Sequence, residues 1–274
     1  MTKYCYLNGK ILPLEKAGIS LRDIGILRGY GIFDFSRTYN GKPFAFKEHF
    51  MRMKHSANVL NLKVPIFEKE TEEIIKKLIS KNKLKEANIR MVLTGGESLD
   101  GISYHSTTFY ILVGDVKKFP ESIYKKGAKL ITYEYLRDEA SAKTLNYITA
   151  IKLQPFKKRQ KAFEILYTYK GYILEATTSN FFIFKKDNLI TPKENILYGI
   201  TRNYVIKLAK DIFKIEERAV SLKELDSATE AFITSTNKEI VPVVKIDNKI
   251  IGNGKVGKNT KKLIEIFHLF TQNY

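Results

Sequence analysis

The 274-residue sequence predicts an α+β fold of two domains, with antiparallel strands in both. Strands are indicated by turn residues that separate short apolar runs, as is typical of β-hairpins, at Asn8-Gly9, Asn40-Gly41 and Lys170-Gly171. Helices are indicated by apolar residues at helical spacing, first over residues 47–60 and then over 67–79. With 44% hydrophobic residues, a chain of this length can bury a sizeable core.

The first domain is expected over residues 1–115. Its strands are predicted as a hairpin over 4–12, a second hairpin over 31–39 and 43–46, and a pair at 89–94 and 107–113. The two helices lie between the second hairpin and the last pair. Over residues 116–126 the regular spacing of apolar residues is interrupted by charged residues and Pro120, which predicts a linker between the domains.

The second domain is expected over residues 127–274. Its strands are predicted in chain order at 128–135, 164–169, 172–176, 181–184, 189–191 and 231–234, with a final pair around Asp247-Asn248. Helices are predicted over 148–160, from Gly199 to Phe213, and over 257–269.

Cysteine content and hydropathy exclude several classes of protein. Cys5 is the only cysteine, which rules out a disulfide framework and a cysteine-built metal site within one chain. No stretch has the roughly 18 consecutive apolar residues of a membrane helix, and the N-terminus lacks the apolar core of a signal peptide. We therefore expect a soluble, cytoplasmic protein with no membrane partner and no metal.

The formal net charge of +18 raises the possibility of a polyanionic partner. However, lysines alternate with glutamates in helical windows such as residues 68–85, which is typical of a solvated helix face. No basic arm, RNA-binding motif or zinc finger is present in the sequence. We expect no nucleic-acid partner, and the charge favours small anionic substrates.

Two charged residues in apolar surroundings are candidates for chemistry. Glu175 stands in an apolar strand pattern, and Lys143 stands among small and apolar residues that could make its amine nucleophilic. A lysine that reacts with an aldehyde, together with a carboxylate for a pyridinium nitrogen, describes a pyridoxal 5'-phosphate site. Each residue also has an ordinary interpretation, Lys143 as an exposed lysine and Glu175 as the partner of one.

A phosphate requires amides, hydroxyls and an arginine, and the sequence offers all three. Thr201 opens a helix after a glycine, where amides and the positive end of the helix dipole receive an anion. Ser235-Thr236-Asn237 follows a strand, and Arg52 lies on a helix. Taken singly, the segment before Thr201 is also explained as an ordinary helix N-cap, and Ser235 and Thr236 are also explained as the end of a strand.

The order of these motifs resembles the class IV pyridoxal-phosphate aminotransferases, the fold type IV group of branched-chain aminotransferases, D-amino acid aminotransferases and aminodeoxychorismate lyase. The resemblance covers nearly the whole chain. It is carried by six motifs: residues 28–34, residues 48–57 with Arg52, residues 143–147, residues 175–180, residues 199–202 and residues 234–242. It implies a smaller N-terminal α/β sandwich domain and a larger C-terminal pseudo-barrel domain that binds the cofactor.

The resemblance also implies roles for individual residues. Lys143 would be the Schiff-base lysine and the general acid and base, and Glu175 would hold the protonated pyridinium nitrogen. Tyr147 would lie near the phenolic oxygen of the cofactor and Leu197 against its ring. The residues implied around the phosphate are Arg52, Ile200, Thr201 and Thr236, with the isoleucine acting through its amide.

The substrate is predicted from the loop and the strand near Arg90. D-amino acid aminotransferases carry an arginine and a histidine two residues apart in this loop, where this chain has Leu99 and Gly101. Branched-chain enzymes carry a Tyr-x-Arg on the strand, where this chain has Asn88-Ile89-Arg90. We therefore expect an L-amino acid aminotransferase of branched-chain type, with 2-oxoglutarate and glutamate as the second pair.

In this hypothesis Phe33 lines the side-chain pocket, Arg90 meets a distal carboxylate, and amides near Thr236 and Asn237 hold the α-carboxylate. A structural salt bridge is the alternative for Arg90. The alternative functions are a lyase that eliminates pyruvate, a D-amino acid aminotransferase, and an inactive binding protein on the same fold. The resemblance further implies a homodimer, with the cofactor in the cleft between the domains and a loop of the neighbouring subunit approaching it.

Overall fold

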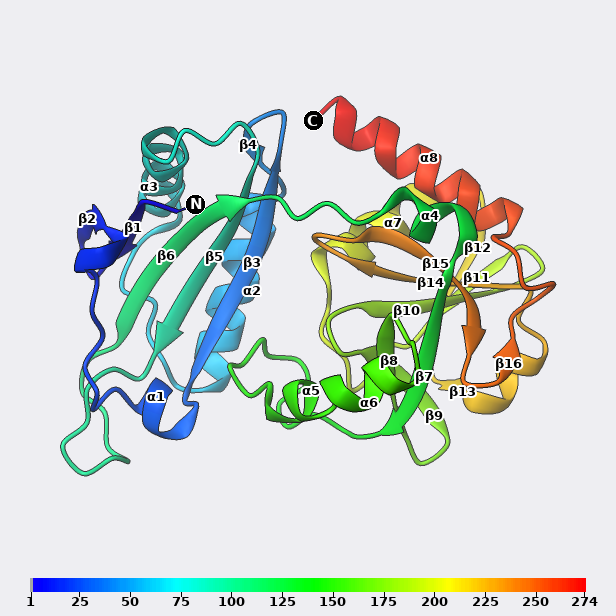
Figure 1. The fold of residues 1–274 in the computed structure, drawn as a ribbon, viewed down its shortest axis with the longest axis horizontal. Helices are drawn as coiled ribbons and strands as arrows, with labels where there is room; N and C mark the ends of the chain where they lie inside the picture. Colours follow the sequence, from blue (N-terminus) through cyan, green and yellow to red (C-terminus); the bar gives the residue numbers. More distant parts are fainter. Residues whose placement is uncertain (1) are drawn as a thin grey trace. The chain divides into compact units, whose positions relative to one another are not determined.

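The computed structural model describes residues 2–274, which form two compact units (Figure 1). Unit 1 comprises the chain up to Lys117, with Ala142–Tyr147 and Tyr274 added. Unit 2 comprises Lys118–Ser141 and Ile148–Asn273. The chain thus leaves the first unit, returns to it for the segment that contains Lys143, and leaves it again.

Unit 1 is built on a six-stranded sheet in which neighbouring strands are antiparallel, in the order β2-β1-β6-β5-β3-β4. The strands are β1 (Tyr4–Leu7), β2 (Lys10–Pro13), β3 (Gly31–Tyr39), β4 (Lys42–Pro43), β5 (Ala87–Thr94) and β6 (Thr108–Asp115). The predicted hairpin turns are confirmed: Asn8 and Asn40 have φ of 42° and 51°, left-handed values that asparagine tolerates well.

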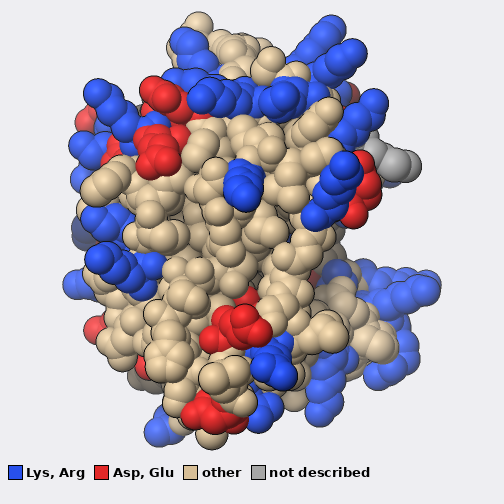
Figure 2. Space-filling model, turned by 90° about the vertical axis from the view of Figure 1, so that its left-hand side faces the viewer, with Lys and Arg blue, Asp and Glu red and all other residues tan. Residues whose placement is uncertain are grey.

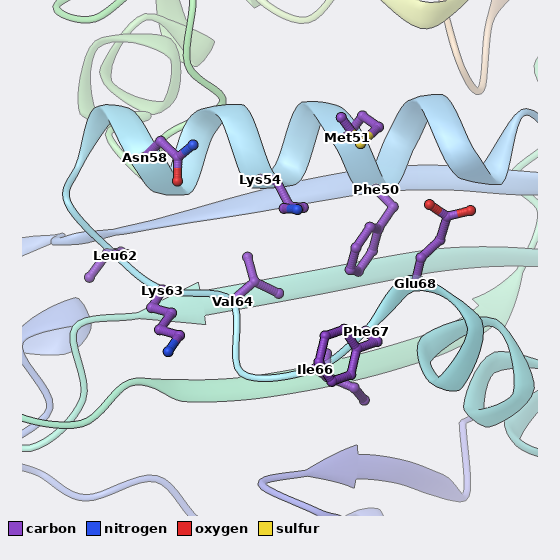
Figure 3. Close-up of a pocket in the computed structure, with 10 residues that line it drawn as sticks. All are labelled: Phe50, Met51, Lys54, Asn58, Leu62, Lys63, Val64, Ile66, Phe67 and Glu68. Atoms are coloured by element: carbon purple, nitrogen blue, oxygen red, sulfur yellow. The ribbon is translucent and has the colours of Figure 1, made fainter.

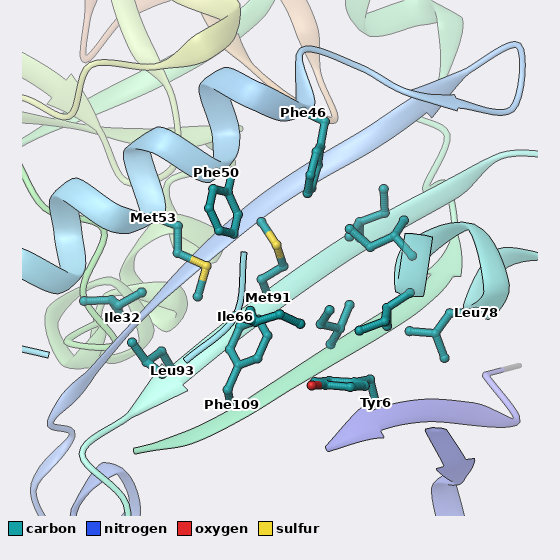
Figure 4. Packing of buried hydrophobic residues seen from close by; sticks show 14 of the residues in the cluster. Tyr6, Ile32, Phe46, Phe50, Met53, Ile66, Leu78, Met91, Leu93 and Phe109 are labelled. Carbon is teal, nitrogen blue, oxygen red and sulfur yellow. The ribbon is translucent and has the colours of Figure 1, made fainter. Parts of the chain in front are cut away.

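The helices of unit 1 are η1 (Leu14–Lys16), α1 (Ile24–Arg28), α2 (Phe46–Val59) and α3 (Glu68–Lys81). Helices α2 and α3 pack on one face of the sheet and confirm the two predicted helices within about two residues. In Figure 4, Phe50 and Met53 of α2 point towards Met91 and Phe109 of the sheet. The apolar period of each helix therefore forms the core of unit 1.

The other face of this sheet carries the alternate residues of the same strands. Ile32 and Met91 belong to the core, so their neighbours Phe33, Phe35 and Arg90 point to the opposite side. Phe33 and Phe35 are half-buried and Arg90 is exposed.

Unit 2 contains a ten-stranded sheet that curls into a half-barrel, in the order β12-β11-β10-β14-β15-β7-β8-β9-β13, with β16 paired to β15. The strands are β7 (Ala128–Glu134), β8 (Glu164–Tyr169), β9 (Tyr172–Ala176), β10 (Asn180–Lys185), β11 (Asn188–Thr191), β12 (Lys214–Glu217), β13 (Val220–Ser221), β14 (Glu230–Ser235), β15 (Glu239–Ile246) and β16 (Lys249–Ile250). Most neighbours are antiparallel, as predicted, but β7 is parallel to both β8 and β15, and β11 is parallel to β12.

The helices of unit 2 are α4 (Glu121–Lys126), α5 (Ile148–Lys152), α6 (Gln154–Arg159), α7 (Ile200–Ala209), η2 (Leu222–Asp226) and α8 (Lys258–Gln272). The single helix predicted over 148–160 is divided in two at Leu153. Pro155 explains the break, because its ring lacks an N–H and clashes with the preceding turn of a continuous helix. Among residues 2–274, no helix has the length and apolar character needed to cross a bilayer.

The segment Ala142–Tyr147 pairs with the first residues of β3. Phe33 donates its amide to the carbonyl of Lys143 at 2.9 Å, and Leu145 donates to the carbonyl of Gly31 at 2.9 Å. An antiparallel bridge joins Ile32 and Thr144 between them. A residue from the middle of the chain is thereby fixed on the sheet of unit 1.

Candidate active site

Phe33 is the centre of a cluster in unit 1 that contains four of the residues predicted from the sequence. The ring centroid of Phe33 lies 4.5 Å from Nζ of Lys143, 5.6 Å from Cζ of Arg90 and 5.5 Å from the ring centroid of Tyr147. The strand-like pairing of Ala142–Tyr147 with β3 brings Lys143 and Tyr147 to this ring. Two cations and two aromatic rings thus share one small region.

Lys143 is anchored through its backbone, whereas its amine is available. Its amide donates to Oγ of Ser56 on α2 at 2.9 Å, and the residue is half-buried. Its Nζ forms no ion pair or hydrogen bond with any of residues 2–274, and it lies 4.5 Å from the centroid of the Phe33 ring. An unpaired amine held over an aromatic ring has the freedom that a nucleophile or proton carrier requires.

Arg52 is held by a buried carboxylate. Its Nε and Nη2 donate to the two oxygens of Asp34 at 2.8 and 3.0 Å, and His49 Nδ1 lies 2.6 Å from the same carboxylate. Nη1 of Arg52 forms no hydrogen bond within residues 2–274. The pair with Asp34 therefore fixes the guanidinium and leaves one nitrogen for an anion.

The electrostatics of this group favour an ionised Asp34 and a neutral His49. Burial by itself would raise the pKa of Asp34, but the charges of Arg52 and His49 and their hydrogen bonds hold it well below its ordinary value. Burial lowers the pKa of His49; the charge and hydrogen bond of Asp34 raise it in part, and the charges of Arg52 and Lys143 act in the same direction as burial. The sequence carried a signal for Asp34, because a charged residue occupies a core position of the β3 alternation.

Glu175 is the buried carboxylate of unit 2, at the end of β9. Its Oε1 accepts from Nε and Nη2 of Arg137 at 2.9 and 2.7 Å, and its Oε2 accepts from the amide of Leu197 at 3.1 Å. Asn180 donates to the carbonyl of Leu197 at 2.7 Å and ties this loop to β10. The sequence did not single out Arg137, which lies in an irregular segment with no pattern to mark it.

The first turn of α7 presents uncapped amides, as the sequence predicts for Ile200 and Thr201. Asn203 makes the first intrahelical hydrogen bond, to Gly199, so the amides of the three preceding residues have no helical acceptor, and no side chain of residues 2–274 caps them. A Cβ at Gly199 would lie 2.1 Å from Oδ1 of Asn180, which explains the glycine. Such an end of a helix is suited to a phosphate.

Thr236 and Asn237 lie at the same end of the sheet as Asn180. The register pairs Asn180 with Thr234 near the end of β14, and the two predicted residues follow directly in the turn to β15. Oγ1 of Thr234 and Oδ1 of Asn237 are buried without a hydrogen-bond partner in the described part of the chain. Buried polar atoms without partners indicate that this region is shaped for a polar ligand.

The predicted residues therefore fall into one group in each unit. Phe33, Arg52, Arg90, Lys143 and Tyr147 belong to unit 1, and Glu175, Leu197, Ile200, Thr201, Thr236 and Asn237 belong to unit 2. A buried carboxylate, uncapped helix amides, unpartnered polar atoms and an available lysine amine are the donor set that pyridoxal 5'-phosphate requires.

A hollow of about 440 Å³ in unit 1 lies elsewhere, between α2 and the chain that leads into α3 (Figure 3). Its wall is mostly apolar and includes Phe50, Leu62 and Phe67 with Lys54 and Lys63. None of the residues predicted from the sequence lines it. On the face of unit 1 drawn in Figure 2, lysines and arginines lie mostly around the margin of a broad area of uncharged residues, and a few acidic residues lie among them.

Comparison with known proteins agrees with this set of residues. The amino-transferase class IV family model matches residues 31–246. The chain is 36% identical to the Methanocaldococcus jannaschii "Putative branched-chain-amino-acid aminotransferase", over 96% of this chain and 94% of that protein. It is 29% identical to D-alanine aminotransferase of Bacillus licheniformis, over 93% of each.

Among solved structures, the fold matches the T.th. branched-chain amino acid aminotransferase in complex with N-(5'-phosphopyridoxyl)-L-glutamate. The TM-score is 0.91 and the identity 26%, with 99% of this chain and 95% of that chain covered. The predicted fold type and the cofactor are confirmed. The chain belongs to the class IV aminotransferase family, whose members are pyridoxal-phosphate-dependent enzymes.

Proposed function

We propose that the protein transfers an amino group between a branched-chain L-amino acid and 2-oxoglutarate. The observation that carries this proposal is the cluster around Phe33, where an apolar ring lies beside the available amine of Lys143 and beside the guanidinium of Arg90. An apolar wall suits a branched side chain, and a guanidinium suits the second carboxylate of glutamate.

The residues that would hold the cofactor come from both groups. Lys143 would be its point of attachment, Tyr147 would lie near its phenolic oxygen, and Glu175 would hold its ring nitrogen, with Leu197 against the ring. The residues proposed for its phosphate are Arg52, Ile200, Thr201 and Thr236. When bound, the cofactor supplies an electron sink for the substrate carbon, and Nζ of Lys143 would accept and return the proton.

The arrangement around Arg90 supports a substrate role over a structural salt bridge. Arg90 forms no ion pair with any of residues 2–274, and it is exposed on the face of the sheet opposite α2 and α3. The α-carboxylate would then be held by amides near Thr236 and Asn237. The adduct of phosphopyridoxyl and L-glutamate bound by the T.th. relative supports glutamate as one substrate.

A D-amino acid aminotransferase is the second candidate, because the Bacillus licheniformis relative bears that name. Leu99 and Gly101 argue against it, since neither side chain can donate a hydrogen bond to a carboxylate. Leu99 is 84% exposed and points an apolar group into solvent. We therefore rank the L-amino acid ahead of the D-amino acid.

We also propose that the protein is a homodimer. Exposed apolar side chains gather at one end of unit 1, on α1 with the residues before it and on the loop after β5: Leu21, Ile26, Leu27, Leu99 and Ile102. The two segments are joined by backbone hydrogen bonds, from Ile24 to Gly96 at 3.0 Å and from Ser98 to Arg22 at 3.1 Å. Apolar side chains grouped in this way favour a protein partner, and a second copy fits the family.

Colour and half-reactions test the function. The purified protein should be yellow, borohydride should bleach it, and Lys143→Ala should abolish the absorbance, while Lys152→Ala on the exposed side of α5 should leave it unchanged. L-leucine, L-isoleucine and L-glutamate should each convert the bound cofactor to its amine form. A colourless protein that takes up no cofactor would refute the enzyme, and a faster reaction with D-alanine would reverse our ranking of substrates.

A further inference from the structure

Arg90 lies between two aromatic side chains of β3. Its Cζ is 5.6 Å from the ring centroid of Phe33 and 5.5 Å from that of Phe35. The register of the sheet causes this, because Phe35 is directly opposite Arg90 and Phe33 is two residues earlier on the same face. Phe35 therefore contacts the guanidinium as closely as Phe33 does, although nothing in the sequence marked it.

Aromatic rings hold a guanidinium in a way that leaves its donors available. The attraction acts between the cation and the ring face, so it occupies none of the five N–H groups. A carboxylate in the same place would occupy two of them and neutralise the charge. Since Arg90 has no ion pair among residues 2–274, its donors are open to an anion from solution.

Phe35 is not needed for the core of unit 1. The core residues of β3 and β5 point towards α2 and α3, whereas Phe35 is half-buried on the opposite face. Tyr110 of β6 shares that face, and its pKa is raised by burial and lowered in part by the charge of Arg90. The charge of Arg90 thus acts across this face of the sheet.

We infer that Phe35 is a positioning residue that, together with Phe33, holds the Arg90 guanidinium as a receptor for the second carboxylate of a dicarboxylate substrate. This inference rests on the proposed function, because it explains how one site would distinguish a five-carbon dicarboxylate from an apolar acid. Phe35 touches no reacting atom in this scheme. It acts by limiting the positions that the guanidinium can take.

A pair of matched ligands tests the inference without turnover. Glutarate and pentanoate both have five carbons, and only glutarate has a second carboxylate. Titration calorimetry on the cofactor-loaded protein should show tighter binding of glutarate. Phe35→Leu should weaken glutarate binding about two- to fivefold, the size of one exposed cation–π contact, and leave pentanoate binding unchanged. Phe35→Tyr, which keeps the ring, should restore the wild-type preference.

A double substitution tests whether Phe35 affects glutarate binding by way of Arg90. Arg90→Leu should remove the preference for glutarate, and adding Phe35→Leu to it should change the preference no further. In steady state, Phe35→Leu should raise KM for L-glutamate with little change in kcat, since binding alone is affected.

Equal weakening of both ligands by Phe35→Leu, or no weakening of either, would overturn the inference. If the wild-type protein bound glutarate no more tightly than pentanoate, the inference that Arg90 receives a second carboxylate would also be overturned. The half-reaction with L-leucine would still report separately on the branched-chain part of the proposed function.

Discussion

Three buried carboxylates in this protein each pair with one long cationic side chain: Asp34 with Arg52, Glu175 with Arg137 and Glu164 with Lys238. Glu164 also accepts hydrogen bonds from the hydroxyls of Thr177, Thr178 and Ser179. The three hydroxyl residues that follow the Glu175 strand therefore have a structural role. They tie the turn between β9 and β10 to Glu164 and so fix where Glu175 and Asn180 lie.

The pair of Arg137 and Glu175 leads to a prediction about stability. Arg137→Ala would leave the carboxylate, whose side chain is 8% exposed, without its cation. Removing one partner of a buried pair typically costs about 3 kcal/mol, so the free energy of unfolding in urea should fall by about that amount. Lys125→Ala, which breaks an exposed pair on α4, is the control and should have no measurable effect.

Glu164 leads to a prediction about acid. Burial would raise its pKa, but Lys238 and the hydroxyls lower it below the ordinary value of 4.5. A lowered pKa in the folded state stabilises the protein above pH 4.5, and this contribution disappears as the pH falls through the folded value. Urea unfolding of Glu164→Gln should show a smaller loss of stability below pH 4.5 than the wild type. Parallel curves for the two proteins would contradict the assignment.

At the scale of elements, the first turn of α7 depends on the closeness of Gly199 to Asn180. A Cβ at Gly199 would approach Oδ1 of Asn180 to 2.1 Å, so the amide that holds the carbonyl of Leu197 must move. Overpacking of this kind costs about 1–3 kcal/mol, and Gly199→Ala should weaken pyridoxal 5'-phosphate binding roughly tenfold. Gly18→Ala, with no atom within 4 Å of the new Cβ, is the matched control. Equal affinities in both variants would refute the role of Gly199.

The elements that sequence alone predicts well are those with local signals. Hairpins at Asn8-Gly9 and Asn40-Gly41 and the amphipathic helices α2 and α3 follow from turn chemistry and apolar period. The parallel pairing of β7 with β8 and β15 joins segments far apart in the chain. No local pattern encodes that pairing, because register between distant strands is chosen by the packing of the whole sheet.

At the scale of the whole molecule, the same limit explains which of the candidate site residues a sequence can mark. Glu175 stands out as a charge within an apolar strand pattern, and Lys143 as a lysine among small and apolar residues, so the local sequence marks them as candidates. Arg137, Phe35 and the pairing of Lys143 with β3 do not, because each depends on which distant segment folds beside it. The order of the motifs along the chain indicated the aminotransferase family, whereas the side chains that contact Glu175 and Arg90 became known only from the structure.

The proposed homodimer leads to a prediction about the exposed apolar residues of unit 1. Leu99 and Ile102 are 84% and 78% exposed on the loop after β5, where burial by a second copy would stabilise an assembly. Changing both residues to aspartate should place uncompensated charges in the contact and shift the protein to the monomer in light scattering at micromolar concentration. Ile250→Asp, at a side chain that is 61% exposed on β16 in unit 2, is the control and should leave the mass unchanged. If the double variant keeps the wild-type mass, the contact lies on another surface.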